Sequence, residues 1–322
     1  MSMWKILGGS ATGSRHIKEG QGCDDAYGWW IDERLAVAVV ADGAGSRTGT
    51  SALGAFTAVK AVLNSATTDD FVQAHIHESA NQYSAIGWLF SQALTEISAQ
   101  ADRLGIAPDL LATTLSVAVI DSARAVIGQV GDGIAVCGLG DLVQTVAVSA
   151  PFEYANETIF LTTPDALSRH LRVFSSDIVM IDAFALTTDG LRYKVLNDLR
   201  RTEPFFPFFR EAWAYVRRSE ATTDEIVTFL ANIDDDQTGD DKTLLIGVKN
   251  FTGSATETES MSPRPPISVP VTSAIGSTPI SQISCPDQGV SDSKRLGLYP
   301  SASDQSAPGL ENAVAPGLAG QL

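Results

Sequence analysis

Positive charge is scarce in this sequence of 322 residues. Lysine and arginine together number 22, against 38 aspartate and glutamate residues, so the formal net charge is −16 at pH 7 with histidine neutral. A chain this acidic is repelled by the phosphates of nucleic acids and by anionic lipid surfaces. We therefore expect neither a nucleic-acid partner nor a membrane partner, although a local cleft loaded with cations would still attract phosphate.

Cysteine and long apolar runs are also scarce. The three cysteines, Cys23, Cys137 and Cys285, are too few and too irregularly spaced for a disulfide framework or a zinc cluster. The longest apolar run, residues 35–41, is far too short to span a bilayer, and residues 1–10 lack the pattern of a signal peptide. The sequence thus predicts a soluble protein in a reducing compartment, the cytoplasm.

The composition changes near residue 251. Hydrophobic residues make up 44% of the chain, which is enough for a sizeable core, but the part from Thr252 onward is rich in Ser, Thr, Pro, Gly and Ala and holds nine of the 14 prolines. Such a segment buries too little apolar surface to offset the entropy lost on ordering. The sequence predicts one folded domain, residues 1–250, and a disordered tail, residues 251–322.

Apolar, β-branched runs predict strands in the domain, and segments with helical spacing predict helices. The expected strands are residues 35–41, 114–121, 125–130, 134–138, 143–148, 178–186 and 243–248, and the expected helices are residues 49–64, 80–104, 208–218 and 223–233. The strands between 114 and 148 follow one another across short turns, so we expect antiparallel hairpins there. A parallel doubly wound sheet would need a crossover helix between each pair, and the order therefore favours antiparallel sheet layers flanked by helices.

Five short acidic turns lie beside these β-like runs. They are Gly22-Cys23-Asp24-Asp25-Ala26, Ala41-Asp42-Gly43-Ala44-Gly45-Ser46, Val130-Gly131-Asp132-Gly133, Thr187-Thr188-Asp189-Gly190 and Gly239-Asp240-Asp241-Lys242-Thr243. Each alone is compatible with an ordinary turn or a solvated loop, and Gly131-Asp132-Gly133 is typical of a hairpin turn. Carboxylates that converge from distant strand ends repel one another unless a hard cation neutralises them, so the set indicates a magnesium or manganese site.

The second turn also matches part of a dinucleotide-binding fingerprint, because Gly43-x-Gly45 lies between an expected strand and an expected helix. The third glycine position holds Thr48, and Asp42 opens the loop where a pyrophosphate would be repelled. A nucleotide-binding oxidoreductase is one alternative hypothesis. If NAD does not shift the thermal unfolding temperature of the protein, this hypothesis is removed.

In order and spacing, the motifs resemble those of the metal-dependent PP2C-type (PPM) serine/threonine phosphatases, and more narrowly a compact bacterial branch of them. The resemblance extends from about residue 6 to residue 248 and includes Ala112-Thr113-Thr114-Leu115-Ser116 besides the acidic turns. It implies an α+β fold, a four-layer α-β-β-α sandwich of two antiparallel sheets flanked by helices. It also implies hydrolysis of phosphoserine and phosphothreonine monoesters by attack of a water that bridges two Mn²⁺ or Mg²⁺ ions.

The resemblance assigns metal-binding roles to positions of this chain. Asp42 matches the aspartate that bridges both metals, and the Gly43 carbonyl matches a backbone ligand of the first metal. Asp189 and Asp240 match carboxylates on the second metal. Asp42 is thereby the central candidate for catalysis as well as for metal binding.

Other positions match supporting roles or depart from the family. Asp25 matches an acidic residue that supports the catalytic site through ordered water or hydrogen bonds, Asp24 contributes to the metal site, and Asp132 matches a residue that can help to hold a third, weaker ion. Many members carry a phosphate-binding arginine where this chain has Gly20. Arg15, further upstream, is the candidate to replace it.

Similar bacterial phosphatases often oppose serine/threonine kinases, which implies a phosphorylated serine/threonine protein as substrate and a cognate kinase pathway. The departures keep a second hypothesis open, a catalytically weak phosphatase-like module that binds phosphoprotein or metal without turnover. His16, beside Arg15, is either a general acid or a surface or structural histidine.

Overall fold

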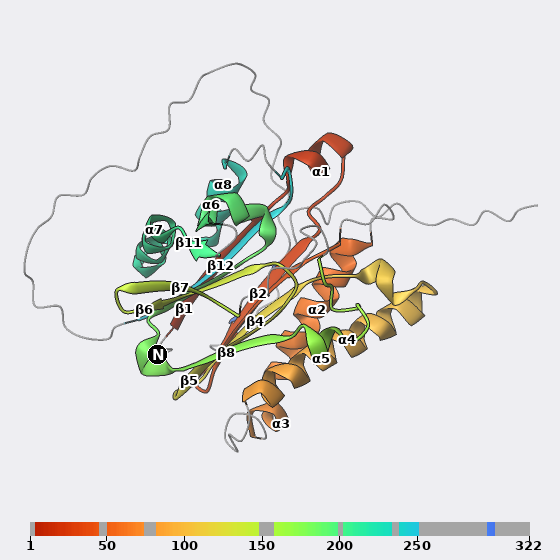
Figure 1. Cartoon of the computed structure of the whole chain (residues 1–322), viewed down its shortest axis with the longest axis horizontal. Coiled ribbons are helices and arrows are strands. Elements are labelled where there is room, and N and C mark those ends of the chain that lie inside the picture. Colours follow the sequence, from red (N-terminus) through yellow and green to blue (C-terminus); the bar gives the residue numbers. More distant parts are fainter. Residues whose placement is uncertain are drawn as a thin grey trace, which may run out of the picture. The chain divides into compact units, whose positions relative to one another are not determined.

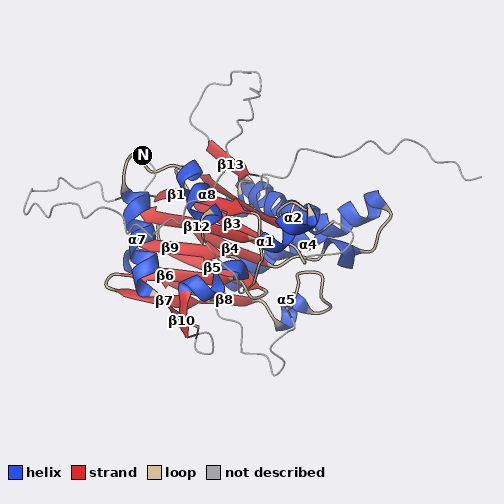
Figure 2. Ribbon diagram, turned by 90° about the horizontal axis from the view of Figure 1, so that it is seen from above, coloured by secondary structure: helices blue, strands red, loops and turns tan. Residues whose placement is uncertain are grey.

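Two antiparallel sheets form the centre of the folded part of the chain (Figure 1). The computed structural model describes residues 4–44, 50–73, 82–147, 158–198, 202–233, 238–250 and 295–299. Helices cover the outer faces of both sheets (Figure 2), so the layers run helix, sheet, sheet, helix. This arrangement confirms the predicted α+β sandwich.

The five-stranded sheet brings the first strand of the domain beside the last. Its strand order is β1 (Trp4–Ala11), β12 (Lys242–Lys249), β9 (Ala183–Thr187), β6 (Ile134–Leu139) and β7 (Leu142–Val146). β1 and β12 are antiparallel and pair along their whole length, from Trp4 opposite Lys249 to Ala11 opposite Lys242. The loop that follows β1 therefore lies beside the loop that precedes β12.

The six-stranded sheet has β3 near its centre. Its order is β13 (Arg295–Tyr299), β2 (Asp25–Ile31), β3 (Ala36–Asp42), β4 (Leu115–Ile120), β5 (Arg124–Val130) and β8 (Arg172–Asp177). The register of β2 with β3 runs from Ile31 opposite Ala36 to Asp25 opposite Asp42. The first two acidic turns of the sequence therefore meet at one end of this sheet.

Three hydrophobic clusters hold the layers together. Between the sheets, Trp29 and Val40 pack in one cluster with Leu245 of the facing sheet. On the outer face of the six-stranded sheet, α2 (Ser51–Ala66) and α4 (Gln82–Leu104) pack on the alternate residues of β3, and α7 (Phe206–Arg217) and α8 (Thr223–Ala231) cover the other sheet. Because both faces of each sheet are covered, central strands are apolar throughout instead of alternating.

The other elements are short. They are α1 (Ser14–Glu19), α3 (Asp69–Phe71), α5 (Ala166–Arg169), α6 (Arg192–Val195), the 3-10 helices η2 (Pro108–Leu111), η3 (Ile178–Met180) and η4 (Asp189–Leu191), and the strand pair β10 (Leu196–Asp198) and β11 (Glu203–Pro204). Within the described residues, no helix combines the length and apolar character needed to cross a bilayer.

The helices expected from spacing are present as α2, α4, α7 and α8. The start of α8 follows its sequence signal, because the Thr222 hydroxyl accepts a hydrogen bond from the backbone N–H of Glu225 at 3.3 Å. Residues 45–49 and 74–81, which include the predicted starts of the first two helices, lie outside the described residues.

The hairpin predicted at Gly131-Asp132-Gly133 is wrong. β5 pairs with β4 and β8, whereas β6 pairs with β7 and β9 in the other sheet. The three residues carry the chain from one sheet to the other, and Gly131 has the left-handed φ of 112° at this crossing. The flanking pairs β4–β5 and β6–β7 are antiparallel as predicted.

A similar crossing changes the strand predicted at 178–186. The segment begins as η3, in which Val179 and Met180 are exposed, and only Ala183–Thr187 pair as β9. The preceding strand, β8, belongs to the six-stranded sheet, so these residues turn the chain toward the five-stranded sheet. The apolar run therefore includes a corner as well as a strand.

The predicted disordered tail differs from the structure at five residues. Arg295–Tyr299 form β13, antiparallel to β2, with Arg295 opposite Ile31 and Tyr299 opposite Tyr27. A segment too polar to build a core can still add to an open sheet edge, because main-chain hydrogen bonds supply the pairing. Residues 251–294 and 300–322 lie outside the described residues, so the domain boundary near 250 stays a prediction.

Candidate active site and metal centre

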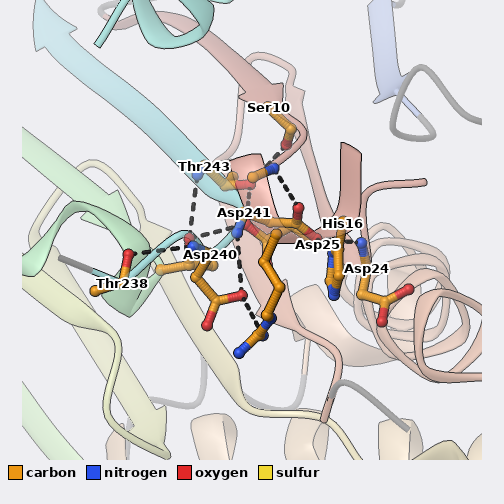
Figure 3. Close-up of polar contacts among 11 residues, drawn as sticks. Ser10, His16, Asp24, Asp25, Thr238, Asp240, Asp241 and Thr243 are labelled. Carbon is orange, nitrogen blue, oxygen red and sulfur yellow. Dashed lines mark hydrogen bonds and ion pairs between the residues drawn. The ribbon is translucent and has the colours of Figure 1, made fainter. Parts of the chain in front are cut away.

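Asp25 is the most enclosed carboxylate of the site. It opens β2 with 2% of its surface exposed, and its Oδ2 accepts hydrogen bonds from the hydroxyls of Thr188 at 2.8 Å and Thr243 at 2.6 Å (Figure 3). Its other oxygen, Oδ1, is buried without a hydrogen-bond partner. Burial, and then the charge of Asp241, raise the pKa of Asp25 well above its usual value.

The threonines that hold Asp25 are themselves fixed by the facing sheet. The backbone N–H of Thr243 donates to the Thr188 hydroxyl at 3.1 Å. The Thr243 hydroxyl is also 2.6 Å from the Ser10 hydroxyl, its cross-strand neighbour on β1. Because the Thr243 proton goes to Asp25, Ser10 is the donor in that pair. The site therefore rests on residues from both sheets.

Asp42 lies opposite Asp25 at the end of β3. Burial raises the pKa of Asp42 well above its usual value, and four neighbouring carboxylates raise it further. These carboxylates belong to Asp25, Asp189, Asp240 and Asp132. Aspartates that are up to 215 residues apart in sequence (Asp25 to Asp240) thus lie close together around Asp42.

Asp189 lies near Asp42, whose pKa its charge raises. Burial, followed by the charge of Asp132, raises the pKa of Asp189 to about 6, although the nearby Arg192 guanidinium lowers it. A cation bound between these carboxylates would relieve their mutual repulsion.

Two glycines allow the loops to approach this closely. A Cβ on Gly43 would lie 2.7 Å from the backbone of Ser51 and 2.8 Å from the Asp24 carbonyl, which instead accepts the Gly43 N–H at 3.2 Å. A Cβ on Gly190 would lie 1.8 Å from the Asp241 carbonyl oxygen. The glycine after each aspartate is therefore required by packing, and it sets the aspartate against its neighbours.

Asp240 forms an ion pair with an arginine that also lines the cavity. The Arg15 Nη2 lies 3.2 Å from Asp240 Oδ1, with the arginine side chain half exposed. The backbone N–H of Asp241 donates to the same carboxyl oxygen at 3.1 Å, and the Asp240 N–H donates to the Thr238 hydroxyl. Figure 3 shows Asp240 between Thr238 and Asp241.

Asp132, at the crossing between the sheets, lies on the other side of the site. Its Oδ2 accepts a hydrogen bond from the Thr158 hydroxyl at 2.9 Å, and the Arg192 Nη2 lies 3.5 Å from it. Arg192 also donates to the Asp132 carbonyl at 3.3 Å. The crossing therefore places this carboxylate against Asp189, whose pKa it raises.

These side chains border one cavity of about 350 Å³. It is lined by Arg15, His16, Glu19, Gln21, Asp42, Gly43, Ala44, Asp132, Thr158, Phe160, Asp189 and Asp240. Six of the eight residues singled out in the sequence are in this lining. The other two, Asp24 and Asp25, lie behind it, and Asp24 is only partly buried with its pKa raised mainly by that burial.

The sequence did not indicate a role for Asp241. This buried carboxylate accepts the backbone N–H groups of Gly13 at 2.7 Å and of Asp24 at 2.6 Å, and its Oδ2 lies 3.0 Å from Nδ1 of His16 (Figure 3). It ties the turn before β12 to α1 and to the start of β2. Its place beside Asp240 in an acidic turn was the available signal, but sequence alone does not tell which of two adjacent carboxylates faces the cavity.

The donor set fits divalent cations of the magnesium or manganese type. The convergent groups are carboxylates, which such hard ions prefer, and the unpartnered Asp25 Oδ1 is an acceptor without a donor. As their side chains lie, no three His, Cys, Asp or Glu residues of the described segments close to coordination distance. That spacing is consistent with the mutual repulsion that raises the pKa values of Asp42 and Asp189.

Comparison with known proteins gives concordant matches. A family model described as protein phosphatase 2C matches residues 12–231. Serine/threonine-protein phosphatase 3 of Escherichia coli (strain K12) is 30% identical over 258 residues, which cover 76% of this chain and 98% of that protein.

Solved structures match the fold. The serine/threonine phosphatase Stp1 from Staphylococcus aureus has a TM-score of 0.52 at 16% identity, covering 77% of this chain and 95% of that chain. The catalytic domain of the serine/threonine protein phosphatase PstP, in complex with two manganese ions, has a TM-score of 0.50 at 14% identity, covering 78% of this chain and 100% of that chain.

Proposed function

The chain belongs to the protein phosphatase 2C family, and from that membership we propose that it is a metal-dependent phosphatase acting on phosphoserine and phosphothreonine in proteins. The name of its Escherichia coli relative supports the substrate class. The observation that carries the proposal is the meeting of Asp42, Asp189 and Asp240 at one cavity, where burial and mutual repulsion raise the pKa values of the first two.

Two Mn²⁺ or Mg²⁺ ions are the proposed cofactors, and Asp132 is the proposed ligand of a third, weaker ion. Their proposed ligands are the carboxylates of Asp24, Asp42, Asp132, Asp189 and Asp240 and the carbonyl of Gly43. The two manganese ions in the PstP structure, which has the same fold, support this number. When bound, such ions would neutralise phosphoryl oxygens and lower the pKa of a nearby water, which makes that water a stronger nucleophile toward phosphorus.

The residues of the chain hold this site in place. Asp25 is fixed by two hydroxyls on Oδ2, and its unpartnered Oδ1 is available to accept a hydrogen bond from water in the site. The Gly43 N–H bond to the Asp24 carbonyl and the pairing of Asp25 with Asp42 fix the two strand ends relative to each other. Preorganised groups of this kind need no rearrangement when charge develops on the substrate.

Arg15 is the proposed phosphate-binding residue. Position 20, where many family members have an arginine, is glycine with open space around it. Arg15 lines the cavity, and its half-exposed guanidinium reaches Asp240. A planar guanidinium at this position can bind two oxygens of a phosphoryl group while it remains beside the aspartate.

The proposed partner is a phosphorylated serine/threonine protein, within a pathway that includes a cognate kinase. The cavity has no apolar floor of the kind that selects a small ligand, since most of its lining is polar or charged. The two described cysteines, Cys23 and Cys137, are buried and not joined in a disulfide, which suits a reducing compartment, and we place the protein in the cytoplasm.

Phosphate release by the purified full chain tests the proposal. Hydrolysis of a phosphoserine peptide is expected with Mn²⁺ or Mg²⁺ and is expected to stop in excess EDTA. Asp42→Asn should lower kcat by at least about 100-fold without loss of the folded state, measured by circular dichroism. Hydrolysis that persists in EDTA contradicts the metal-dependent mechanism. Metal binding without turnover, seen by calorimetry, would instead identify a binding module.

A further inference from the structure

His16 is buried beside the cavity and is not a surface histidine. It lies on α1 with 4% of its surface exposed, and it borders the same cavity as Asp42 and Asp240. Its Nδ1 lies 3.0 Å from Oδ2 of Asp241 (Figure 3). The ring is therefore held at one nitrogen by a buried carboxylate, and the residue borders the cavity where the substrate is proposed to react.

Asp241 determines the tautomer of the His16 ring. The carboxylate already accepts backbone N–H groups from Gly13 and Asp24, so it acts as an acceptor toward Nδ1 as well. Nδ1 must then hold a proton in both charge states of the ring. The other ring nitrogen, Nε2, has no hydrogen-bond partner within the described part of the chain, so a proton there can pass to a substrate.

The other cavity residues cannot take this role in the proposed reaction. Arg15 does not release a proton at accessible pH. The aspartates of the lining are assigned to cations, and Glu19 is exposed, so no neighbour fixes its orientation. Of the described lining residues, His16 alone combines enclosure, a fixed orientation and an exchangeable proton.

Resting on the proposed phosphatase function, we propose that His16 is the general acid that protonates the leaving oxygen of the phosphoester, and that Asp241 is its positioning residue. The oxygen of the attacking water forms a bond to phosphorus while the bond between phosphorus and the ester oxygen breaks with both electrons on the ester oxygen. The proton on Nε2 moves to that oxygen, which leaves as the serine or threonine hydroxyl. His16 remains as a neutral imidazole with its Nδ1–H on Asp241, and water returns the lost proton.

A comparison of leaving groups tests this assignment. Nitrophenolate departs well without a proton, whereas phenolate and above all a serine alkoxide do not. His16→Asn retains a side-chain N–H close to the position of Nδ1, and so can keep the bond to Asp241, but it removes Nε2. We expect the variant to lose about 100-fold or more in kcat/KM on phenyl phosphate and a phosphoserine peptide, but less than about 5-fold on p-nitrophenyl phosphate.

The matched control is His170→Asn, which replaces a histidine outside the cavity lining and should leave both rates and their ratio unchanged. Equal losses of His16→Asn on phenyl and p-nitrophenyl phosphate would show a structural or phosphate-binding role and overturn the proposal. A wild-type chain that hydrolyses none of the three substrates would refute the proposed function itself, and the assignment of His16 with it.

Two measurements do not depend on the folding of that variant. ¹⁵N NMR of the histidine side chains, in the metal-free wild type, is expected to show His16 protonated at Nδ1, and a neutral Nε2–H tautomer overturns the proposal. In wild type, rates over a series of substituted phenyl phosphates should depend only weakly on leaving-group basicity, because the proton offsets developing charge. A steep dependence would likewise overturn it.

Discussion

Asp25 and Asp42 are direct cross-strand partners at the end of the six-stranded sheet, and an oxygen of Asp25 is buried there without a donor. Like charges placed opposite one another weaken a sheet. Burial then raises the pKa values of both groups. This arrangement lowers the stability of the metal-free protein, and bound cations would restore that stability.

This cost predicts an unusual pH dependence for the metal-free protein. Asp189 has its pKa raised to about 6, whereas an unfolded aspartate titrates near about 4. Between these values the folded state binds more protons than the unfolded state, so stability contributed by this group falls as pH rises through that window. The loss amounts to roughly 3 kcal/mol at most once both states are ionised.

Thermal unfolding in EDTA at pH 5 and pH 7.5 measures the effect. We expect the effect of Asp189→Asn on Tm to be more favourable at pH 7.5 than at pH 5. Comparison of the variant with the wild type at each pH separates Asp189 from the other titrating groups. Addition of Mn²⁺ should raise Tm of the wild type at pH 7.5 and have little effect on the variant. A wild type whose difference from the variant is independent of pH contradicts the prediction.

Gly190→Ala should damage both the fold and the site. Its Cβ would stand 1.8 Å from the Asp241 carbonyl oxygen, which is backbone and cannot rotate away. Overpacking of this kind costs about 3 kcal/mol. In a domain of this size Tm should fall by roughly 10 °C, and calorimetry should show weaker Mn²⁺ binding because the loop of Asp240 must move.

The matched control is Gly87→Ala on α4, where the nearest atom to the new Cβ is a Leu171 side-chain carbon at 3.9 Å. An alanine in a helix interior is preferred to glycine by up to about 1 kcal/mol, so this variant should be as stable as wild type or more stable. Equal effects of the two substitutions would contradict the packing argument.

Arg15→Ala tests the proposed phosphate contact. A charge-assisted hydrogen bond contributes about 1.5–3 kcal/mol, which corresponds to roughly a 10- to 100-fold fall in kcat/KM on a phosphoserine peptide. Arg15→Lys should lie between wild type and the alanine variant, because it keeps the charge and loses the planar fork. Lys18→Ala, an exposed charge on the same helix, should leave the kinetics unchanged. Unchanged kcat/KM in Arg15→Ala rejects this role.

The tail strand β13 should protect the edge of β2. Substituting the adjacent residues Leu296 and Gly297 by proline in the full chain removes one main-chain donor from each edge of β13, one of which faces β2, and so opposes pairing with residues 27–31. Hydrogen exchange measured by mass spectrometry should then become faster in the peptide that contains β2. Leu310→Pro, a substitution of the same type elsewhere in the tail, should have no such effect. Unchanged exchange in the double variant would show that β13 does not cover this edge in solution.

The sequence predicts best what is local. The strand ending at Asp42 is a continuous apolar run, and α8 has a threonine cap, so both could be located within a few residues. Strands β1, β2 and β8 were not predicted. β1 contains two glycines, β2 begins with an acidic residue, and β8 is a partly exposed strand with several polar residues. Their β structure comes from pairing with distant strands, which no short window of sequence contains.

Some residues of the candidate site could likewise be predicted from local sequence, and others could not. Ordered acidic turns identified Asp42, Asp189 and Asp240, because each follows or precedes an apolar strand. The crossing at Asp132 was mistaken for a hairpin, since a turn sequence does not say to which sheet the next strand belongs. The pair formed by His16 and Asp241 joins residues 225 apart, and only the folded chain shows it.

The pairing of β1 with β12 also determines when the five-stranded sheet can be completed during synthesis of the chain. The first strand to leave the ribosome finds its neighbour in the sheet only when the strand at Lys242–Lys249 has been made. No nascent fragment that stops earlier can complete the five-stranded sheet, and Ser10 and Thr243 cannot meet before then. Long-range closure of this type is slow. The catalytic centre is therefore assembled as one of the last steps in the maturation of the domain.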